Sequence, residues 1–437
     1  MPNALWNTGD MLYGGGIDWR VRVDHPEVPM SFRSRFAILL LAGMVAAPVG
    51  CGKKTSTFPT DAATPVLPVP STGPPVTEVE AMEFGKEVVL AVRTKDRAKF
   101  EKVLHATEFW ERCIQDLDFS SADRNFYLND LSVQMGQMYE QIASTYDRDG
   151  DLTVLGVRPN NGKMECVLRL REEGVNYFVC TLARFPDASI GMEDWHNLSS
   201  GVSLSQMYRR QAIPLALGRK GGLSKVPQKD RAFIEHAKKL YALEQAVVKK
   251  DFDNAMKLFR SLPQELQDEK WIAWMGLIVS VGLDEAIYLQ EIERFMKLFP
   301  DDPGLDLLTL GHWESKREWK RGLECLERFD HFIGGDPYLN TYRTIFLIKL
   351  GRTTEAKVSA RQLLAAEPKL EGSFYTMAYY LVMTKDYAGA VENYKQVVTK
   401  LGRSLALEQL LTDPDYSVFV KSKEYADLKK WAEARSK

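Results

Sequence analysis

Between residues 239 and 400 the apolar positions follow a helical spacing, and one short pattern returns every 33 or 34 positions. In most occurrences a compact residue is followed four positions later by a larger apolar residue on the same helical face. The five pairs are Ala255 with Phe259, Tyr288 with Ile292, Gly322 with Leu326, Ala356 with Ala360, and Ala390 with Tyr394. A repeat of this length predicts pairs of antiparallel helices, each pair stacked on the next, with the first residue of each pattern where two helices cross closely.

The two best-preserved units are residues 337–368 and 372–398. Gly351 lies between two predicted helices, where a left-handed residue is expected, and Pro368 follows a second helix, which a proline cannot continue. The junction at 334–337 carries additional residues. These features resemble the tetratricopeptide repeat family, and the resemblance covers roughly residues 230 to 437. It implies a helical solenoid whose first helices line a concave groove that binds peptides.

On that register, the first helices present a set of polar and aromatic side chains to the groove. The candidate partner-binding residues are Glu314, Tyr338, Thr341, Lys349, Tyr375 and Tyr379. Packing between neighbouring repeats explains any one of them equally well. As a set, they make the groove the best candidate for partner binding, because stacked helix pairs create an extended concave surface.

Helical spacing also predicts helices between Glu78 and Ser144, and the period then changes to two. Alternating apolar positions predict strands, and Asn- and Gly-containing segments predict the turns between the first three. The strands are expected at 152–157, 163–171, 175–184 and 190–197, with turns at 160–162 and 172–174 and a return to helix at 204–217.

Helices followed by an antiparallel meander predict an α+β domain with helices on one face of the sheet. The order of elements is similar to that of the cone-shaped fold shared by ketosteroid isomerases and nuclear transport factors. This resemblance concerns element order alone, and it carries no catalytic residue over to this chain.

A basic start and a short apolar run lie between Met30 and Cys51. Arg33 and Arg35 precede apolar residues 36–49, a pattern typical of a secretory signal and too short for a comfortable membrane-spanning helix. Since residues 1–29 carry no periodicity, the pattern favours Met30 over Met1 as the initiator.

Residues 48–51 resemble the cleavage box of bacterial lipoproteins. The resemblance implies that Cys51 becomes the first residue of the mature protein and carries acyl chains. The alternative is an ordinary secretory signal with Cys51 near the cleavage site. The proline-rich residues 52–77 have almost nothing to bury, so they predict an extended tether.

The chain is therefore expected to be a multidomain protein in which an all-α solenoid follows the α+β domain. The predicted parts are an upstream extension and signal peptide (1–50, ending before Cys51), a tether (52–77), the α+β domain (78–217), a linker (218–228), five helix pairs (229–400) and capping helices (401–437, with helices at 404–411 and 422–434).

Composition changes this picture little. The 437 residues are 45% hydrophobic with a formal net charge of -2, which suits a globular protein of several domains and gives no electrostatic reason to expect nucleic acid. Five cysteines are too few for a disulfide scaffold. Cys166 and Cys180 lie opposite one another, or nearly so, in a predicted hairpin. They are either buried free thiols or a disulfide of an exported protein.

The chain shows no motif for common catalytic chemistry. The six histidines are scattered, with none at the i, i+4 spacing of two metal ligands on one helix. In residues 147–151 the glycine comes too early for a calcium loop, and Arg158 stands where a glutamate is needed, so a polar turn fits better. Serine-hydrolase, dinucleotide and phosphate-loop motifs are absent from the sequence. We expect no catalytic residue, metal or cofactor.

Together these features predict an exported lipoprotein that faces the periplasm or exterior and acts as a protein-binding scaffold through its repeat groove. Its partner is expected to be a protein or peptide of the cell envelope. The alternative is a small-ligand site, or a hydrolase or isomerase, in the α+β domain. A pocket lined by Trp195, His196 and converging acids would favour the alternative, and a solid apolar core there would favour the scaffold.

Overall fold

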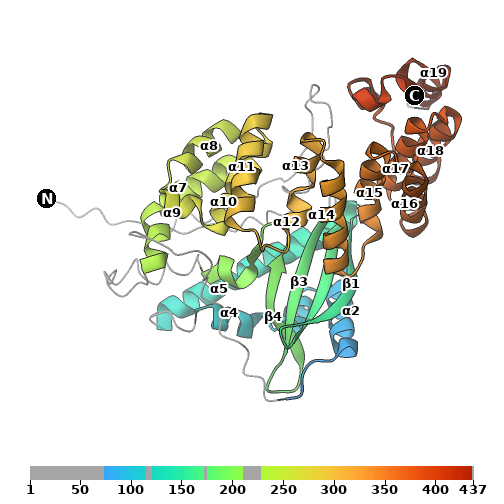
Figure 1. Ribbon diagram of the computed structural model, residues 1–437. Coiled ribbons are helices and arrows are strands. Elements are labelled where there is room, and N and C mark those ends of the chain that lie inside the picture. The colour runs from blue at the N-terminus through green and yellow to red at the C-terminus, as the bar shows by residue number, and fades with distance from the viewer. Residues whose placement is uncertain (1–72, 115–120, 149, 172–174, 210–227, 436–437) are drawn as a thin grey trace.

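The computed structural model describes residues 73–114, 121–148, 150–171, 175–209 and 228–435 (Figure 1). Cys51, the predicted signal and most of the predicted tether and linker lie outside these ranges. Among the described helices, none is long and apolar enough to cross a membrane.

In the described residues, the α-helices before the sheet are α2 (Glu78–Arg93), α3 (Arg97–Val103), α4 (Ala106–Ile114) and α5 (Ser121–Ser144). The start of α2 is fixed by reciprocal capping. The Thr77 hydroxyl accepts a hydrogen bond from the Glu80 amide at 3.3 Å, and the Glu80 carboxylate accepts one from the Thr77 amide at 2.9 Å. The predicted start at Glu78 and the predicted helix from Ser121 to Ser144 are confirmed.

The sheet has five antiparallel strands in the order in which they follow along the chain. They are β1 (Asp151–Asn160), β2 (Lys163–Arg171), β3 (Val175–Arg184), β4 (Ile190–Asn197) and β5 (Val202–Ser203). The four predicted strands are confirmed, although β1 is longer than expected and β5 was not predicted. Asn161 and Gly162 both have positive φ, as a tight two-residue hairpin turn requires. Residues 204–209 are helical, and the rest of the predicted helix lies outside the described residues.

Both faces of the sheet are covered, whereas helices were expected on one face only. Leu168 and Phe178 point from β2 and β3 into a core shared with the N-terminal helices. Their neighbours Val167, Tyr177 and Val179 point the other way and join the core of the C-terminal helical region. In Figure 1 that region lies above the sheet, and its last helices extend beyond it. The sheet is therefore a shared middle layer.

The C-terminal region consists of successive helices. They are α7 (Gln228–Val248), α8 (Phe252–Arg260), α9 (Gln264–Gln267), α10 (Lys270–Val281), α11 (Glu285–Leu298), α12 (Leu305–Leu308), α13 (Leu310–Ser315), α14 (Trp319–Ile333), α15 (Asn340–Lys349), α16 (Thr353–Ala366), α17 (Glu371–Met383), α18 (Tyr387–Leu401) and α19 (Lys423–Glu433). All ten residues of the five predicted pairs are buried. A Cβ atom at Gly322 would lie 2.8 Å from the Phe346 ring on α15, so this glycine permits the close approach of two helices.

Four turns between paired helices share one geometry. Lys250, Arg317, Gly351 and Lys385 each lie two residues after one helix and two before the next, with φ of 58°, 56°, 73° and 64°. The left-handed turn predicted at Gly351 is confirmed. Three of the four positions carry a side chain in a conformation that favours glycine.

Short 3-10 helices follow α18 in place of the predicted helix at 404–411. They are η4 (Leu407–Leu411), η5 (Pro414–Tyr416) and η6 (Phe419–Lys421). A proline restricts the residue before it to extended conformations, and Asp413 indeed has φ -88° and ψ 120°. This proline separates η4 from η5, but the predicted helix at 404–411 is wrong before that point, because residues 402–406 have no regular structure and only the 3-10 helix η4 follows. The second predicted closing helix is confirmed as α19.

Candidate functional site

Two of the predicted groove residues, Lys349 at the end of α15 and Tyr379 on α17, converge on one carboxylate, that of Asp415 in η5. The Lys349 ammonium lies 2.6 Å from each carboxylate oxygen, and the Tyr379 hydroxyl donates to Oδ2 at 2.7 Å. The Lys349 and Asp415 side chains are only 22% and 25% exposed. Partial burial strengthens such charge-assisted bonds, so these three groups form a defined carboxylate site.

Aromatic rings surround this carboxylate site. The Lys349 ammonium is 5.7 Å from the centre of the Trp319 ring, and the rings of Tyr379 and Tyr416 are 5.9 Å apart. Burial and the neighbouring Asp415 charge raise the pKa of Tyr379, which keeps its hydroxyl protonated as a donor. We call Trp319, Lys349, Tyr379 and the adjoining surface of α15 and α17 the α15–α17 face.

The other predicted groove residues have different surroundings. The Tyr375 hydroxyl donates to Glu371 at 2.5 Å, one turn away on the same helix. Tyr338 lies in η3 (Pro337–Leu339), with its ring 6.3 Å from that of Tyr342. Glu314 and Thr341 lie half-buried on α13 and α15. The structure thus brings two of the six predicted residues together on a shared partner.

Asp415 was missed in the sequence because it lies beyond the last repeat, where only a capping role was expected. The sequence around Asp415 does contain a feature from which this site could have been predicted. Asp413, Pro414, Asp415 and Tyr416 form an acidic, proline-containing turn next to the aromatic Tyr416. Asp413 shapes the turn, since its carboxylate accepts the Asp415 amide at 2.9 Å.

A buried charge network joins the sheet to the ends of the helices above it. Arg169 on β2 pairs with Asp336 at 2.7 Å and with Glu367 at 2.8 Å, and the Tyr177 hydroxyl donates to Asp336 at 2.8 Å. The Asp336 side chain is fully buried. Asp336 belongs to the junction of additional residues at 334–337, which explains that departure from the regular repeat.

A second arginine of the sheet contacts the C-terminal end of α14, the helix that precedes Asp336. Arg158 on β1 donates to the carbonyl of Phe332 and stacks over its ring at 3.8 Å. The carbonyl groups at a helix C-terminus carry partial negative charge, so arginines of the sheet are favourable partners for α14.

Trp195 and His196 do not line a common pocket. Trp195 packs against Phe178 in the core below the sheet, whereas His196 points to the opposite side, towards Asp302 and Lys270. The His196 Nε2 atom is buried without a hydrogen-bond partner among the described residues. Burial lowers the pKa of His196 to about 4, so the ring is neutral at neutral pH. The condition that would favour a small-ligand site at these two residues is not met.

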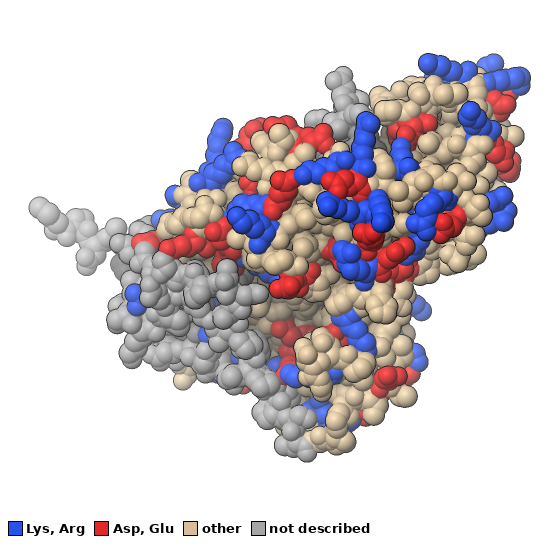
Figure 2. All heavy atoms as spheres, viewed as in Figure 1, with Lys and Arg blue, Asp and Glu red and all other residues tan. Residues whose placement is uncertain are grey.

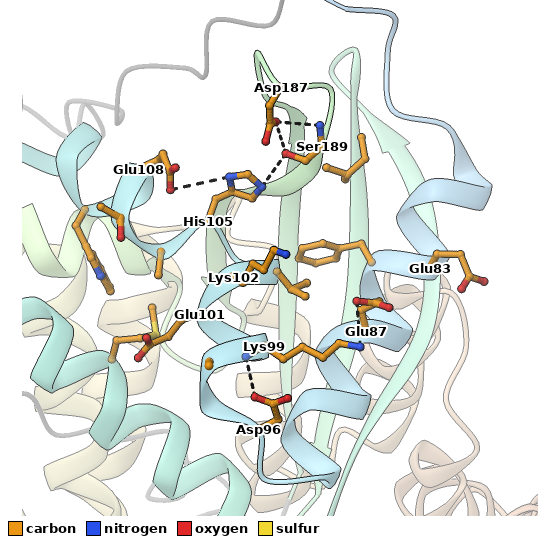
Figure 3. Close-up of a pocket in the computed structure, with 18 of the residues that line it drawn as sticks. Glu83, Glu87, Asp96, Lys99, Glu101, Lys102, His105, Glu108, Asp187 and Ser189 are labelled. Carbon is orange, nitrogen blue, oxygen red and sulfur yellow. Dashed lines mark hydrogen bonds and ion pairs between the residues drawn. The ribbon is translucent and has the colours of Figure 1, made fainter.

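A cavity of about 1390 Å³ opens elsewhere, among α2, α3, α4, α5 and the β3–β4 hairpin (Figure 3). Phe84 and Trp110 contribute apolar wall, and charged side chains form much of the rest. Figure 3 shows His105, Glu108 and Ser189 grouped at one end.

The histidine at this end is held tightly. His105 has φ of 49°, its ring stacks on Phe185 at 3.9 Å, and a Cβ atom at Gly191 would lie 2.3 Å from the ring. His105 Nε2 lies 2.9 Å from Ser189 Oγ, and Nδ1 lies 3.9 Å from Glu108.

Ser189 and His105 are placed like a serine nucleophile and its histidine base. In such a pair the serine hydroxyl donates its proton to the histidine, whereas here it donates to Asp187. The Ser189 hydroxyl also contacts the Asp187 carboxylate, and hydrogen bonds from Ser189 lower the pKa of Asp187, so this group is ionised and can only accept. The serine therefore donates to Asp187, and His105 Nε2–H donates to the serine. The arrangement ties the hairpin tip to the α3–α4 turn and does not activate Ser189.

Cys166 and Cys180 lie directly opposite one another on β2 and β3, as free and buried thiols. Burial raises the pKa of Cys166 to about 12 and that of Cys180 well above its usual value. Both thiols are therefore protonated at neutral pH and unreactive as thiolates.

On the face shown in Figure 2, basic and acidic side chains are mixed over the helices and do not gather in a patch of one sign. Within the described ranges, no group of three or more His, Cys, Asp or Glu residues is arranged to hold a metal ion. No model of a known protein family matches this sequence, and no curated protein matches it.

Proposed function

We propose that the protein is an envelope lipoprotein that binds another protein or peptide through the α15–α17 face. The observation that carries this proposal is the convergence of Lys349 and Tyr379, from two neighbouring helices, on the carboxylate of Asp415. A surface that already binds one acidic side chain in an aromatic setting has the chemistry of a peptide-binding groove.

The helical region supports a solenoid of the tetratricopeptide type. Five helix pairs follow one another, and the residues of the 33- and 34-residue pattern are buried on the second helix of each pair. Stacked pairs of this kind bury a continuous core and leave the first helices to form a concave binding surface.

Binding is tested with point variants of the full-length chain, because removal of residues 230–437 would expose the apolar face of the sheet. Lys349→Ala combined with Tyr379→Phe removes both groups that hold the carboxylate. Lys395→Ala is a matched control, since its ammonium also lies 5.7 Å from a tryptophan ring, that of Trp431.

Cross-linking in native membranes, followed by purification and mass spectrometry, compares the three proteins. We expect partners captured by the wild type and by Lys395→Ala to be lost with the double variant. Capture of the same partners by all three folded proteins would refute the proposed binding face.

The proposed membrane anchor has a separate test. Cys51→Ser removes the thiol through which the lipid would be attached, so we expect the protein to move from the membrane to the soluble fraction and to lose a metabolic fatty-acid label. A single acyl chain binds membranes only weakly, whereas several chains hold durably. Unchanged fractionation without any label in the wild type would contradict the anchor.

The second candidate function is small-ligand binding in the α+β part, and the cavity at His105 is the observation in its favour. Ala98 lines this cavity and is exposed, so Ala98→Trp would fill space there without disturbing the core. Native mass spectrometry of the purified protein should show a bound molecule that Ala98→Trp displaces. A wild-type protein without any adduct would count against this candidate.

A further inference from the structure

The turn that carries Asp415 is attached to the rest of the molecule unevenly. Its two ends are anchored by Leu407 and Phe419, which are 4% and 0% exposed. Between these anchors, Tyr416 is buried and only 5% exposed, whereas Leu411 and Val418 are 55% and 66% exposed and contribute little burial. The middle of the segment is consequently held mainly by the Asp415 carboxylate and by the neighbouring Tyr416 ring.

The segment also has weak internal support. Its regular structure consists of the 3-10 helices η4, η5 and η6, whose hydrogen-bond geometry is poorer than that of an α-helix. Opening of the turn between these anchors breaks the contacts of Asp415 with Lys349 and Tyr379 and exposes Tyr416, whereas the already exposed Leu411 and Val418 lose little.

Release of the turn would leave the α15–α17 face without the Asp415 carboxylate that it binds. Lys349 and Tyr379 are largely buried beside Trp319, where an unpaired ammonium group is unfavourable. A competitor is therefore favoured only if it brings a carboxylate of its own. An aromatic residue next to that carboxylate would replace the Tyr416 ring against Tyr379.

We infer that the turn from Asp413 to Tyr416 is an internal occupant of the α15–α17 face, and that the partner binds with an acidic segment whose carboxylate and adjoining aromatic ring displace Asp415 and Tyr416. This inference rests on the proposed function and specifies the chemistry of its partner. The same contacts that close the C-terminal end of the helical region would then regulate access to the face.

The probe is a fluorescein-labelled peptide with the sequence of residues 411–418, Leu-Thr-Asp-Pro-Asp-Tyr-Ser-Val. It is titrated against the full chain carrying Cys51→Ser and against the same chain with Asp415→Asn added. We expect the Asp415→Asn protein to bind the peptide about tenfold more tightly, because the internal competitor is weakened. Addition of Lys349→Ala should abolish this gain, and a peptide with Asn in place of its second Asp should bind neither protein.

A second measurement does not depend on the stability of the Asp415 variant. Val418→Cys, labelled with an environment-sensitive dye, reports on the turn in a protein that retains Asp415. The labelled site is exposed, whereas Cys113, Cys166, Cys180 and Cys325 are buried. The acidic peptide should change the dye emission, and the Asn peptide should not.

Equal peptide affinity for the two folded proteins, together with an unchanged dye signal, would overturn the inference and leave the turn as a structural cap. That result can be separated from failure of the proposed function. If cross-linked partners are still lost with Lys349→Ala and Tyr379→Phe, the face binds a partner by chemistry other than displacement of Asp415.

Discussion

At the scale of single residues, Gly351 and Lys385 offer a direct comparison, because they occupy the same turn in successive helix pairs. Both are exposed and have φ of 73° and 64°, and a Cβ atom at Gly351 would meet nothing within 4 Å. The two positions therefore differ mainly in the strain that a side chain imposes on a left-handed backbone.

We predict opposite effects for two substitutions at this turn. Gly351→Ala should lower the free energy of unfolding by about 1 kcal/mol, and Lys385→Gly should raise it by about 0.5–1 kcal/mol. Urea denaturation followed by circular dichroism measures both. Changes of the same sign in the two variants would show that packing, not backbone strain, dominates at these turns.

His196 predicts a dependence of stability on pH. Burial holds its pKa at about 4 in the folded protein, below the ordinary value of 6.5. The unfolded chain therefore binds more protons between these values, and the free energy of unfolding should fall as the pH is lowered from 6.5 towards 4, by up to about 3 kcal/mol. His196→Asn should remove most of this slope. The exposed His331→Asn is the control, and an identical slope in His196→Asn and the wild type would contradict the assignment.

At the scale of elements, Phe419 organises the segment between α18 and α19. Its ring is fully buried and lies 5.4, 6.2 and 5.5 Å from the rings of Tyr387, Tyr394 and Tyr425. The C-terminal 3-10 helices therefore depend on one aromatic cluster.

Phe419→Ala should destabilise the C-terminal end by about 3–5 kcal/mol, because it removes a large side chain from a closed core. The exposed Val418→Ala should change stability by less than about 0.5 kcal/mol. Hydrogen exchange is expected to rise in α18 and α19 for the first variant only. Unchanged exchange in Phe419→Ala would mean that the segment is held by other contacts.

The elements that could be predicted from the sequence are those specified by neighbouring residues. The start of α2 at Glu78, the alternating strands and the turn at Asn161 depend on residues a few positions apart, so their places followed from spacing, although β1 extends beyond its predicted bounds. The 3-10 helix at 407–411 and the short β5 could not be predicted, because tertiary contacts select these conformations. In the candidate site, Lys349 and Tyr379 were predicted from the repeat register, whereas Asp415 was missed since its role depends on a non-local contact.

At the scale of the whole molecule, the buried network around Arg169 joins the two halves of the chain. Arg169 and Asp336 are each 3% exposed, and removal of one partner leaves an uncompensated charge at a closed interface. Arg169→Met should therefore lower the free energy of unfolding by about 3–5 kcal/mol.

Arg352→Met is the matched control, because Arg352 and Glu355 form a solvent-exposed pair at the start of α16 and should contribute little to stability. Calorimetry and denaturant unfolding measure both variants. Equal stability of Arg169→Met and the wild type would show that the charge network contributes nothing to holding the sheet and the helices together.

The covered second face of the sheet has a mechanical consequence for the row of helices above it. In a free-standing row of helix pairs, each pair contacts only the pairs next to it. Small changes in the angle between pairs therefore add up along the row, and the whole row is flexible. Here the ends of α14 and α16 are fastened to β2 through Asp336 and Glu367, which fixes the curvature at the point where α15 begins. For the proposed partner, docking on this stiffened stretch would order little of the protein, so that more of the binding energy would be retained as affinity.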